Sequence, residues 1–347
     1  MNNQIIQKEF PLLSVVIKAY NIEKELLDRC VLSAVQQTYT NLEILLVNNA
    51  STDDTGIYCD EWSDKDNRIK VIHNHENAFD HKILSNITGD YLHILDHDDW
   101  IDPNMYSKMM SAMLSTNSDI ARCEYCLTYP DGRIVQRNIT HNADNVEILG
   151  REEAVMLLLE NTKWDAFFWQ NIFKKHLFAY LTYSKEKVFG DLVRTHILFH
   201  HASQTVYLHD VLYFYYQRHG STINPCTKPK QKYIDYCRCN SIYARYLFVI
   251  QNPQYHGILQ IVKKDATREG LITLWNMIDY PQIFPDNAYE TQIERLKKLS
   301  FSIRDGIFFV LNFDLWILKR FTCCYKSYYW IFWRNLKRIK RLIKYVT

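Results

Sequence analysis

The stretch LLSVVIKAYNIEKELLDRCVLSAVQQTYTNLEILLVNN, residues 12–49, decides the fold. Its two apolar runs, 12–20 and 42–49, have strand length, and the segment between them has apolar residues at helical spacing. Ser51 or Thr52 can cap a further helix, and the RIKVIHN that follows predicts a third strand. This alternation predicts an α/β fold, in which helices flank a mostly parallel, Rossmann-like sheet that binds ligands at the carboxyl ends of its strands.

The composition is that of an ordered globular protein. Hydrophobic residues make up 47% and charged residues 23% of the 347 residues. The first residues contain no secretory signal, so we expect a cytoplasmic location. The nine cysteines have no framework spacing and are expected to be reduced thiols. Cys123 and Cys126 form a C-x-x-C, but the sequence offers no paired ligands to complete a zinc site.

A fourth apolar run, DYLHILDHDDW at residues 90–100, ends in a crowded group of carboxylates, Asp96, Asp98 and Asp99. Like charges this close raise one another's pKa, which is costly unless a cation neutralises them. Hard oxygen ligands suit Mg²⁺ or Mn²⁺, which often bridge protein carboxylates to nucleotide phosphates. The alternative is a solvated acidic turn that caps the following helix.

Four separated segments, SVVIKAYN, QTYTNLEILLVNNASTDDT, TGDYLHILDHDDWIDPNMY and LYFYYQRHGSTI, together resemble a family 2 glycosyltransferase with the GT-A fold. The resemblance covers about residues 12–225 and is to the bacterial type that builds surface polysaccharide or lipooligosaccharide. It implies an enzyme that transfers a hexose from a nucleotide-sugar, expected to be a UDP-sugar, with Mn²⁺ or Mg²⁺ as cofactor.

The resemblance also implies a nucleotide site and a metal site. It assigns the nucleotide base to Ala19, Tyr20, Asn21, Asn48 and Asn49. The family pair at the last two positions normally contains an acid, so an alternative is that these asparagines shape a turn. It places Asp96 at the ribose or the metal and Asp98 on the metal.

Asp191 matches the family's general base, although the preceding residue is Gly190 where the family generally has Glu. The alternative for Asp191 is a helix N-cap. Arg218 and Ser221 match residues that reach the diphosphate, and a guanidinium suits phosphate oxygens.

Residues 78–88 lack the glycine-rich stretch and the Arg-Asn pair that the family usually has there. Lys82 or His81 can supply a replacement cation near the pyrophosphate, or the loop no longer binds a donor. Lys18 adds a further cation near the nucleotide crevice.

Residues 151–178 have helical periodicity and an aromatic cluster at positions 164–169. In the family this region lines the acceptor side, so these rings can stack on a sugar. A core role is the favoured alternative, because several apolar aromatics on one helix face are more often core.

We expect a glycosyltransferase domain at residues 1–225, with a nucleotide-binding half at 1–110 and an acceptor half at 111–225. A helical subdomain is expected at 226–308. Residues 309–347, called the basic tail below, predict a basic, aromatic, amphipathic helix.

The basic tail concentrates positive charge, because residues 315–347 hold nine Lys or Arg and no Asp or Glu, leaving about −7 (+2 − 9) for the rest. Its Tyr, Trp and Phe residues favour the surface of an anionic membrane over nucleic acid, and no run is long enough to span a bilayer. Folding back on the catalytic domain, or pairing with another subunit in an oligomer, is the alternative.

The leading hypothesis is an inverting, metal-dependent transfer to a glycan or lipid-linked acceptor at the cytoplasmic membrane face, in cell-surface polysaccharide synthesis. The second is a catalytically impaired binding or scaffold protein with the same fold, suggested by Asn48, Asn49, Gly190 and the altered 78–88 loop. A nucleotidyltransferase is disfavoured, because the first strand lacks a glycine-rich phosphate loop.

Overall fold

The computed structural model describes residues 10–76, 81–136, 146–160, 164–181, 189–218 and 227–299. The chain forms two compact units, residues 1–221 and 222–347. The first unit contains the sheet and all described residues that the sequence predicts to be catalytic, donor-binding or metal-binding. The second unit is helical.

The sheet of the first unit has the strand order β3-β2-β1-β4-β9-β6-β10-β5, with β7 paired to β6 and β8 paired to β10. Its strands are β1 (Leu13–Ala19), β2 (Leu42–Asn49), β3 (Ile69–Asn74), β4 (Tyr91–Asp96), β5 (Trp100–Ile101), β6 (Ile120–Thr128), β7 (Ile134–Gln136), β8 (Val146–Gly150), β9 (Asn171–Lys174) and β10 (Gln204–Tyr216). Strands β1 to β4 pair in parallel, as do β6 and β10, whereas β5, β7, β8 and β9 run antiparallel to their partners.

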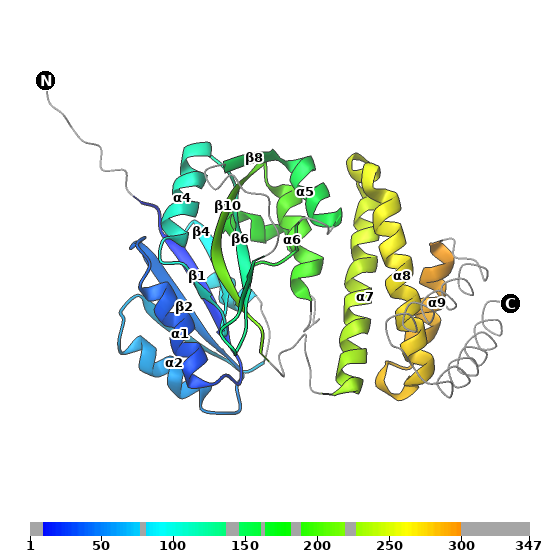
Figure 1. Ribbon diagram of the computed structural model, residues 1–347, viewed down its shortest axis with the longest axis horizontal. Coiled ribbons are helices and arrows are strands. Elements are labelled where there is room, and N and C mark those ends of the chain that lie inside the picture. The colour runs from blue at the N-terminus through cyan, green and yellow to red at the C-terminus, as the bar shows by residue number, and fades with distance from the viewer. Residues whose placement is uncertain are drawn as a thin grey trace, which may run out of the picture. The chain divides into compact units, whose positions relative to one another are not determined.

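Helices alternate with these strands along the chain (Figure 1). They are α1 (Lys24–Val35), α2 (Thr55–Ser63), α3 (His81–Ser85), α4 (Met105–Thr116), α5 (Arg151–Glu160) and α6 (Gly190–His201), with a 3-10 turn at Lys175–Tyr180. In α1 the residues Leu27, Cys30, Val31 and Ala34 are buried, which is the spacing of one helix face. The α/β fold with a mostly parallel sheet is therefore confirmed.

Two local predictions are wrong. The helix α2 begins at Thr55 after Asp54, and neither Ser51 nor Thr52 caps it, because both hydroxyls instead accept hydrogen bonds from Asn21. The helix predicted through residues 151–178 ends at Glu160, because residues 171–174 form β9 between β4 and β6. Pairing with two strands distant in sequence overrides the local helical pattern.

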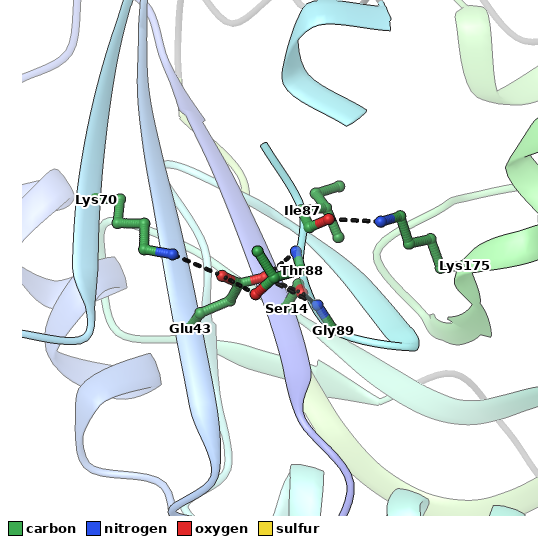
Figure 2. Close-up of polar contacts among 7 residues, drawn as sticks. All are labelled: Ser14, Glu43, Lys70, Ile87, Thr88, Gly89 and Lys175. Carbon is green, nitrogen blue, oxygen red and sulfur yellow. Dashed lines mark hydrogen bonds and ion pairs between the residues drawn. The ribbon is translucent and has the colours of Figure 1, made fainter. Parts of the chain in front are cut away.

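A polar network at the amino ends of the strands fixes where β4 begins (Figure 2). Glu43, with a side chain only 6% exposed, accepts hydrogen bonds from the Thr88 hydroxyl at 2.7 Å and the Gly89 amide at 3.1 Å, and it pairs with Lys70 at 3.1 Å. Ser14 donates to the same carboxylate. The network ties the residues before β4 to β1, β2 and β3.

The second unit contains α7 (Lys228–Gln251), α8 (Leu259–Asp279), α9 (Ala288–Lys298) and the 3-10 turns Pro253–Ile258 and Pro281–Ile283. Helices α7 and α8 pack on each other, and α9 packs on α8, where Gly270 lies under the Gln292 side chain. Among the described residues, no helix has both the length and the apolar character needed to cross a membrane. The basic tail lies outside the described residues.

Candidate active site

The acidic segment follows β4 and divides into carboxylates with different surroundings. Asp99 is fully buried and accepts hydrogen bonds from the Tyr213 hydroxyl and the Tyr216 amide, both at 2.7 Å. Burial raises the pKa of Asp99 well above its usual value, and the charges of Asp98 and Asp96 add to the effect. Asp99 therefore joins the acidic segment to β10 and is not available to a ligand.

Asp96 ends β4 next to Lys18, its partner in the parallel register with β1. Its backbone oxygen accepts from the Cys30 thiol at 3.3 Å, whereas no hydrogen bond reaches its carboxylate from the residues that the structure describes. Burial, followed by the charge of Asp98, raises the pKa of Asp96 to about 6, and Lys18 opposes this shift. The carboxylate is thus placed to meet a cation or a hydroxyl.

Asp98 is held between two arginines. Its carboxylate accepts from Nε of Arg218 at 2.7 Å, and its backbone oxygen accepts from Arg29 at 2.8 Å. The Arg29 guanidinium lies 3.9 Å above the Trp100 ring and 4.5 Å from the Tyr216 ring. Because only Nε of Arg218 is used in this ion pair, its terminal N–H groups can still contact phosphate oxygens.

The chemistry of these carboxylates fits a divalent cation. Asp96 and Asp98 offer hard oxygen ligands at one strand end. Burial, and after it the charge of Asp98, raise the pKa of Asp96, and a bound cation would offset both effects. Within the described ranges, no cluster of three His, Cys, Asp or Glu side chains forms a protein cage for a metal, at Cys123 and Cys126 or elsewhere. Two carboxylates plus phosphate and water oxygens are a common arrangement for Mg²⁺.

Asp191 lies in the first turn of α6, beside the acidic segment. The Leu192 amide donates to its carboxylate at 2.8 Å, and the charges of Asp191 and Asp96 both act on Lys18. Burial raises the pKa of Asp191, opposed by the Leu192 amide, Lys18 and Arg194. Asp191, Asp96 and Lys18 come from three separate elements and lie near enough for their charges to act on one another.

The backbone that leads into α6 is strained. Phe189 has a φ of +58°, in the left-handed region that a bulky side chain rarely adopts. Such a conformation costs on the order of 1–3 kcal/mol and is often found at functional sites. Thr195 anchors the turn, because its hydroxyl donates to the backbone oxygens of Ala166 at 2.6 Å and Asp191 at 2.9 Å.

The residues assigned to the nucleotide base lie at the ends of β1 and β2. Ala19 is buried and pairs with Asn48, whereas Tyr20 is 41% exposed at the strand end. Asn21 bridges to the loop after β2, since its side-chain oxygen accepts from the Thr52 amide at 2.9 Å. These contacts hold the two loops together.

The two asparagines of β2 also contact the chain itself. Asn48 accepts from the Ser51 amide and contacts His73, both at 3.1 Å. Asn49 is only 3% exposed and accepts from Asn74 at 3.1 Å. Of this pair, the partly exposed Asn48 is the better placed to meet a base.

The structure does not reach all of the predicted residues. Ser221 and the side chains of Lys82 and His81 lie outside the described residues. Conversely, the sequence reasoning missed Arg29 and Arg194. Arg29 has no local signal, whereas Arg194 follows Asp191 by three residues, a spacing that places both on one helix face.

The aromatic cluster at 164–169 is mainly core, and it lies on a loop and not on a helix. Trp169 is stacked between Phe167 at 4.6 Å and Tyr213 at 4.2 Å. Trp164 is 4% exposed and packs against Phe199. Phe167 is partly exposed, so it is the ring of this stack that remains accessible to a sugar.

Comparison with known proteins decides the family. Residues 14–180 match the family model described as Glycosyl transferase family 2. Glycosyltransferase GlyG of Streptococcus pneumoniae serotype 4 is 31% identical over 222 residues, which cover 60% of this chain and 72% of GlyG. The chain belongs to glycosyltransferase family 2. It is therefore a glycosyltransferase, and the resemblance read from the sequence is confirmed.

Other family members and solved structures are consistent with this assignment. Glycosyltransferase GlyA of the same organism is 27% identical over 216 residues, and the match covers 60% of this chain but only 31% of GlyA. The structure of TarS from Staphylococcus aureus, solved with UDP-GlcNAc, has a TM-score of 0.52 at 16% identity, covering 85% of this chain and 92% of that one. The mannosyltransferase PcManGT from Pyrobaculum calidifontis, solved with GDP-Man and Mn²⁺, has a TM-score of 0.50 at 15% identity, covering 98% and 88%. These likenesses confirm the GT-A fold.

Proposed function

We propose that this chain transfers one sugar from a nucleotide-sugar, with inversion, to a glycan or lipid-linked acceptor in cell-surface polysaccharide synthesis. The observation that carries the proposal is the meeting of Asp96, Lys18 and Asp191 at the carboxyl ends of β1 and β4 and the start of α6. Parallel α/β sheets bind ligands at this edge. That TarS was solved with UDP-GlcNAc and PcManGT with GDP-Man supports a nucleotide-sugar as the donor, and we propose a UDP-sugar.

The donor diphosphate is proposed to bind between the acidic segment and Arg218. Asp96 and Asp98 would hold Mn²⁺ or Mg²⁺, which when bound supplies a Lewis acid that offsets negative charge on the departing diphosphate. PcManGT, solved with Mn²⁺, supports this choice. Arg218 keeps Asp98 in place through Nε and directs its other N–H groups to the phosphates.

Transfer is proposed as a single displacement with Asp191 as the general base. Its carboxylate takes the proton of the acceptor hydroxyl while that oxygen bonds to the anomeric carbon. The bond from the anomeric carbon to the diphosphate oxygen breaks at the same time, and its electron pair leaves with the nucleoside diphosphate. The raised pKa of Asp191 favours this role, because a base with a higher pKa accepts a proton more readily.

The test is a panel of nucleotide-sugars incubated with the full chain and Mn²⁺ or Mg²⁺, following released nucleotide and thermal stabilisation. We expect one donor to be turned over and chelation to stop the reaction. Asp98→Asn should abolish metal-dependent donor binding, whereas Asp191→Asn should lower turnover by about 10²-fold or more and leave donor binding nearly intact.

The second candidate, a binding or scaffold protein without catalysis, predicts a different result. Donor binding without any released nucleotide would favour it. So would a lack of both nucleotide release and thermal stabilisation with all uridine, guanosine and thymidine donors. The hydrogen bonds that engage Asn48 and Asn49 within the chain are the observation that keeps this candidate open.

A further inference from the structure

Gly190, the first residue of α6, borders the guanidinium of Arg194. A Cβ atom built at Gly190 would lie 2.8 Å from Nη1 and 3.5 Å from Cζ of Arg194. Cβ atoms essentially never come within 3.0 Å of such an atom, so a side chain at position 190 would force Arg194 to move. Arg194 is only 6% exposed, which leaves it little free space into which to move.

The guanidinium folds back toward the amino end of its own helix. Helical side chains point toward the amino terminus, so a residue covers those three and four positions before it, here Asp191 and Gly190. The charge of Arg194 acts on Asp191 and also on Lys18. Among the described residues, the charged groups near Asp191 include Lys18 from β1, Asp96 from β4 and Arg194 from α6.

The main chain of this turn is already fixed. Thr195 is fully buried and bonds to the backbone oxygens of Ala166 and Asp191, and Phe189 holds a left-handed conformation just before the helix. The Asp191 carboxylate itself accepts from the Leu192 amide at 2.8 Å. A cation on the same helix face limits the directions that this carboxylate can take.

We propose that Arg194 is a positioning residue for the Asp191 carboxylate, and that position 190 is glycine because the guanidinium fills the place of its side chain. The inference rests on the proposed role of Asp191 as the base. A side chain at position 190 would displace the Arg194 guanidinium, so a change at either residue alters the position of the same positive charge near Asp191.

The experiment compares steady-state turnover and donor affinity of full-length Gly190→Ala, Arg194→Gln, Arg194→Lys and the double variant Gly190→Ala/Arg194→Gln. We expect Gly190→Ala and Arg194→Gln each to lower kcat by on the order of 10-fold to 10²-fold, the loss typical of a misplaced catalytic group, with the donor Kd unchanged. Arg194→Lys should recover part of kcat because it restores the charge. The double variant should be no slower than Arg194→Gln, because residues that share one contact are not additive.

Gly150→Ala is the matched control, since no atom lies within 4 Å of a Cβ built there, and it should behave as the natural chain does. Multiplied losses in the double variant overturn the proposal, as does wild-type kcat in Arg194→Gln. If Arg194→Gln does not fold, Gly190→Ala and Arg194→Lys decide the question. The proposal then requires that kcat changes while the midpoint of thermal unfolding stays unchanged. If Asp191→Asn keeps full turnover, the base assignment fails, and if the natural chain turns over no donor, the proposed function fails and this inference with it.

Discussion

Asn21 lies two residues after the end of β1 and has a backbone φ of +44°, a left-handed conformation that asparagine tolerates better than most residues. Its amide donates to the Ser51 hydroxyl at 3.2 Å, and its side-chain oxygen accepts from the Thr52 amide at 2.9 Å. Position 21 thus requires a residue that tolerates a left-handed backbone and whose side chain accepts a hydrogen bond. The loops that flank the proposed nucleotide site depend on both.

We predict that Asn21→Ala destabilises the fold by about 1–3 kcal/mol, the sum of left-handed strain and a lost hydrogen bond. Asn21→Gly should cost about 1 kcal/mol less, because glycine adopts this φ without strain. Unfolding in urea measures the difference, and donor binding should weaken in both variants.

Asn117, which has a φ of +55° at the end of α4, is the control. At this position too, the Gly variant should be more stable than the Ala variant. Neither variant should change the affinity for the donor. If Asn21→Ala is as stable as Asn21→Gly, the strain argument is wrong.

At the level of elements, the polar network around Glu43 determines where β4 starts and hence where Asp96 lies. A Cβ at Gly89 would come within 2.6 Å of the Leu12 backbone oxygen and of the Ser14 hydroxyl, so the chain passes very close to β1 at this point. A shift of one residue in β4 would move Asp96 away from Lys18 and turn its side chain to the other face of the sheet.

We predict that Glu43→Gln lowers the free energy of unfolding by about 1–3 kcal/mol, because buried donors lose a charged acceptor. Burial alone raises the pKa of Glu43, but hydrogen bonds from Ser14, Thr88 and Lys70 outweigh it and lower the pKa to about 2. A lowered folded-state pKa stabilises the fold above the unfolded value of about 4.5, and this stabilisation is lost as the pH falls toward about 2. The stability of Glu43→Gln should therefore fall less steeply than that of the natural chain in this window.

Urea unfolding across that pH window measures both effects, and the matched control is Glu76→Gln, whose side chain is exposed. An equal acid slope in Glu43→Gln and the natural chain would contradict the argument. Donor affinity should fall with Glu43→Gln if β4 shifts, although Glu43 lies at the opposite end of the strands from Asp96.

Elements with a strong local pattern were predictable from the sequence, and those made by distant pairing were not. The strands β1 to β4 and the helix α1 follow from apolar periodicity. The ends of β1, β2, β3 and α1 lie within two residues of the expected positions, whereas β4 ends at Asp96, four residues before the end of the 90–100 run. The strand β9 exists only because β4 and β6 provide partners, so residues 171–174 carry no local signal for it. For the same reason, Asp96 and Asp98 could be predicted as site residues, because they form an acidic cluster that is visible in the sequence. Arg29 could not, because its contacts arise only on folding.

At the scale of the whole molecule, positive charge is concentrated in the basic tail, whereas the rest of the chain has a net negative charge. The basic tail lies outside the described residues, and residues 315–347 within it hold nine Lys or Arg and no Asp or Glu. Such a segment is attracted to anionic lipid headgroups, each basic residue contributing about 1 kcal/mol near the surface. The aromatic residues beside these charges favour the interface between membrane and water.

We predict that the full-length protein sediments with vesicles containing anionic phosphatidylserine and not with neutral phosphatidylcholine vesicles. Replacing four tail residues with Gln should weaken binding by on the order of 10² to 10³-fold, because about 4 kcal/mol of attraction is lost. The four residues are Lys337, Arg338, Lys340 and Arg341.

The matched control replaces four exposed lysines of the second unit with Gln and should leave vesicle binding unchanged, namely Lys230, Lys264, Lys297 and Lys298. Binding that persists in 1 M salt would contradict an electrostatic origin, because the screening length there is only about 3 Å. Preference for RNA or DNA over vesicles would assign the tail to nucleic acid. A change from dimer to monomer in the tail variant would assign it to subunit pairing, so the three results separate the possible partners of the tail.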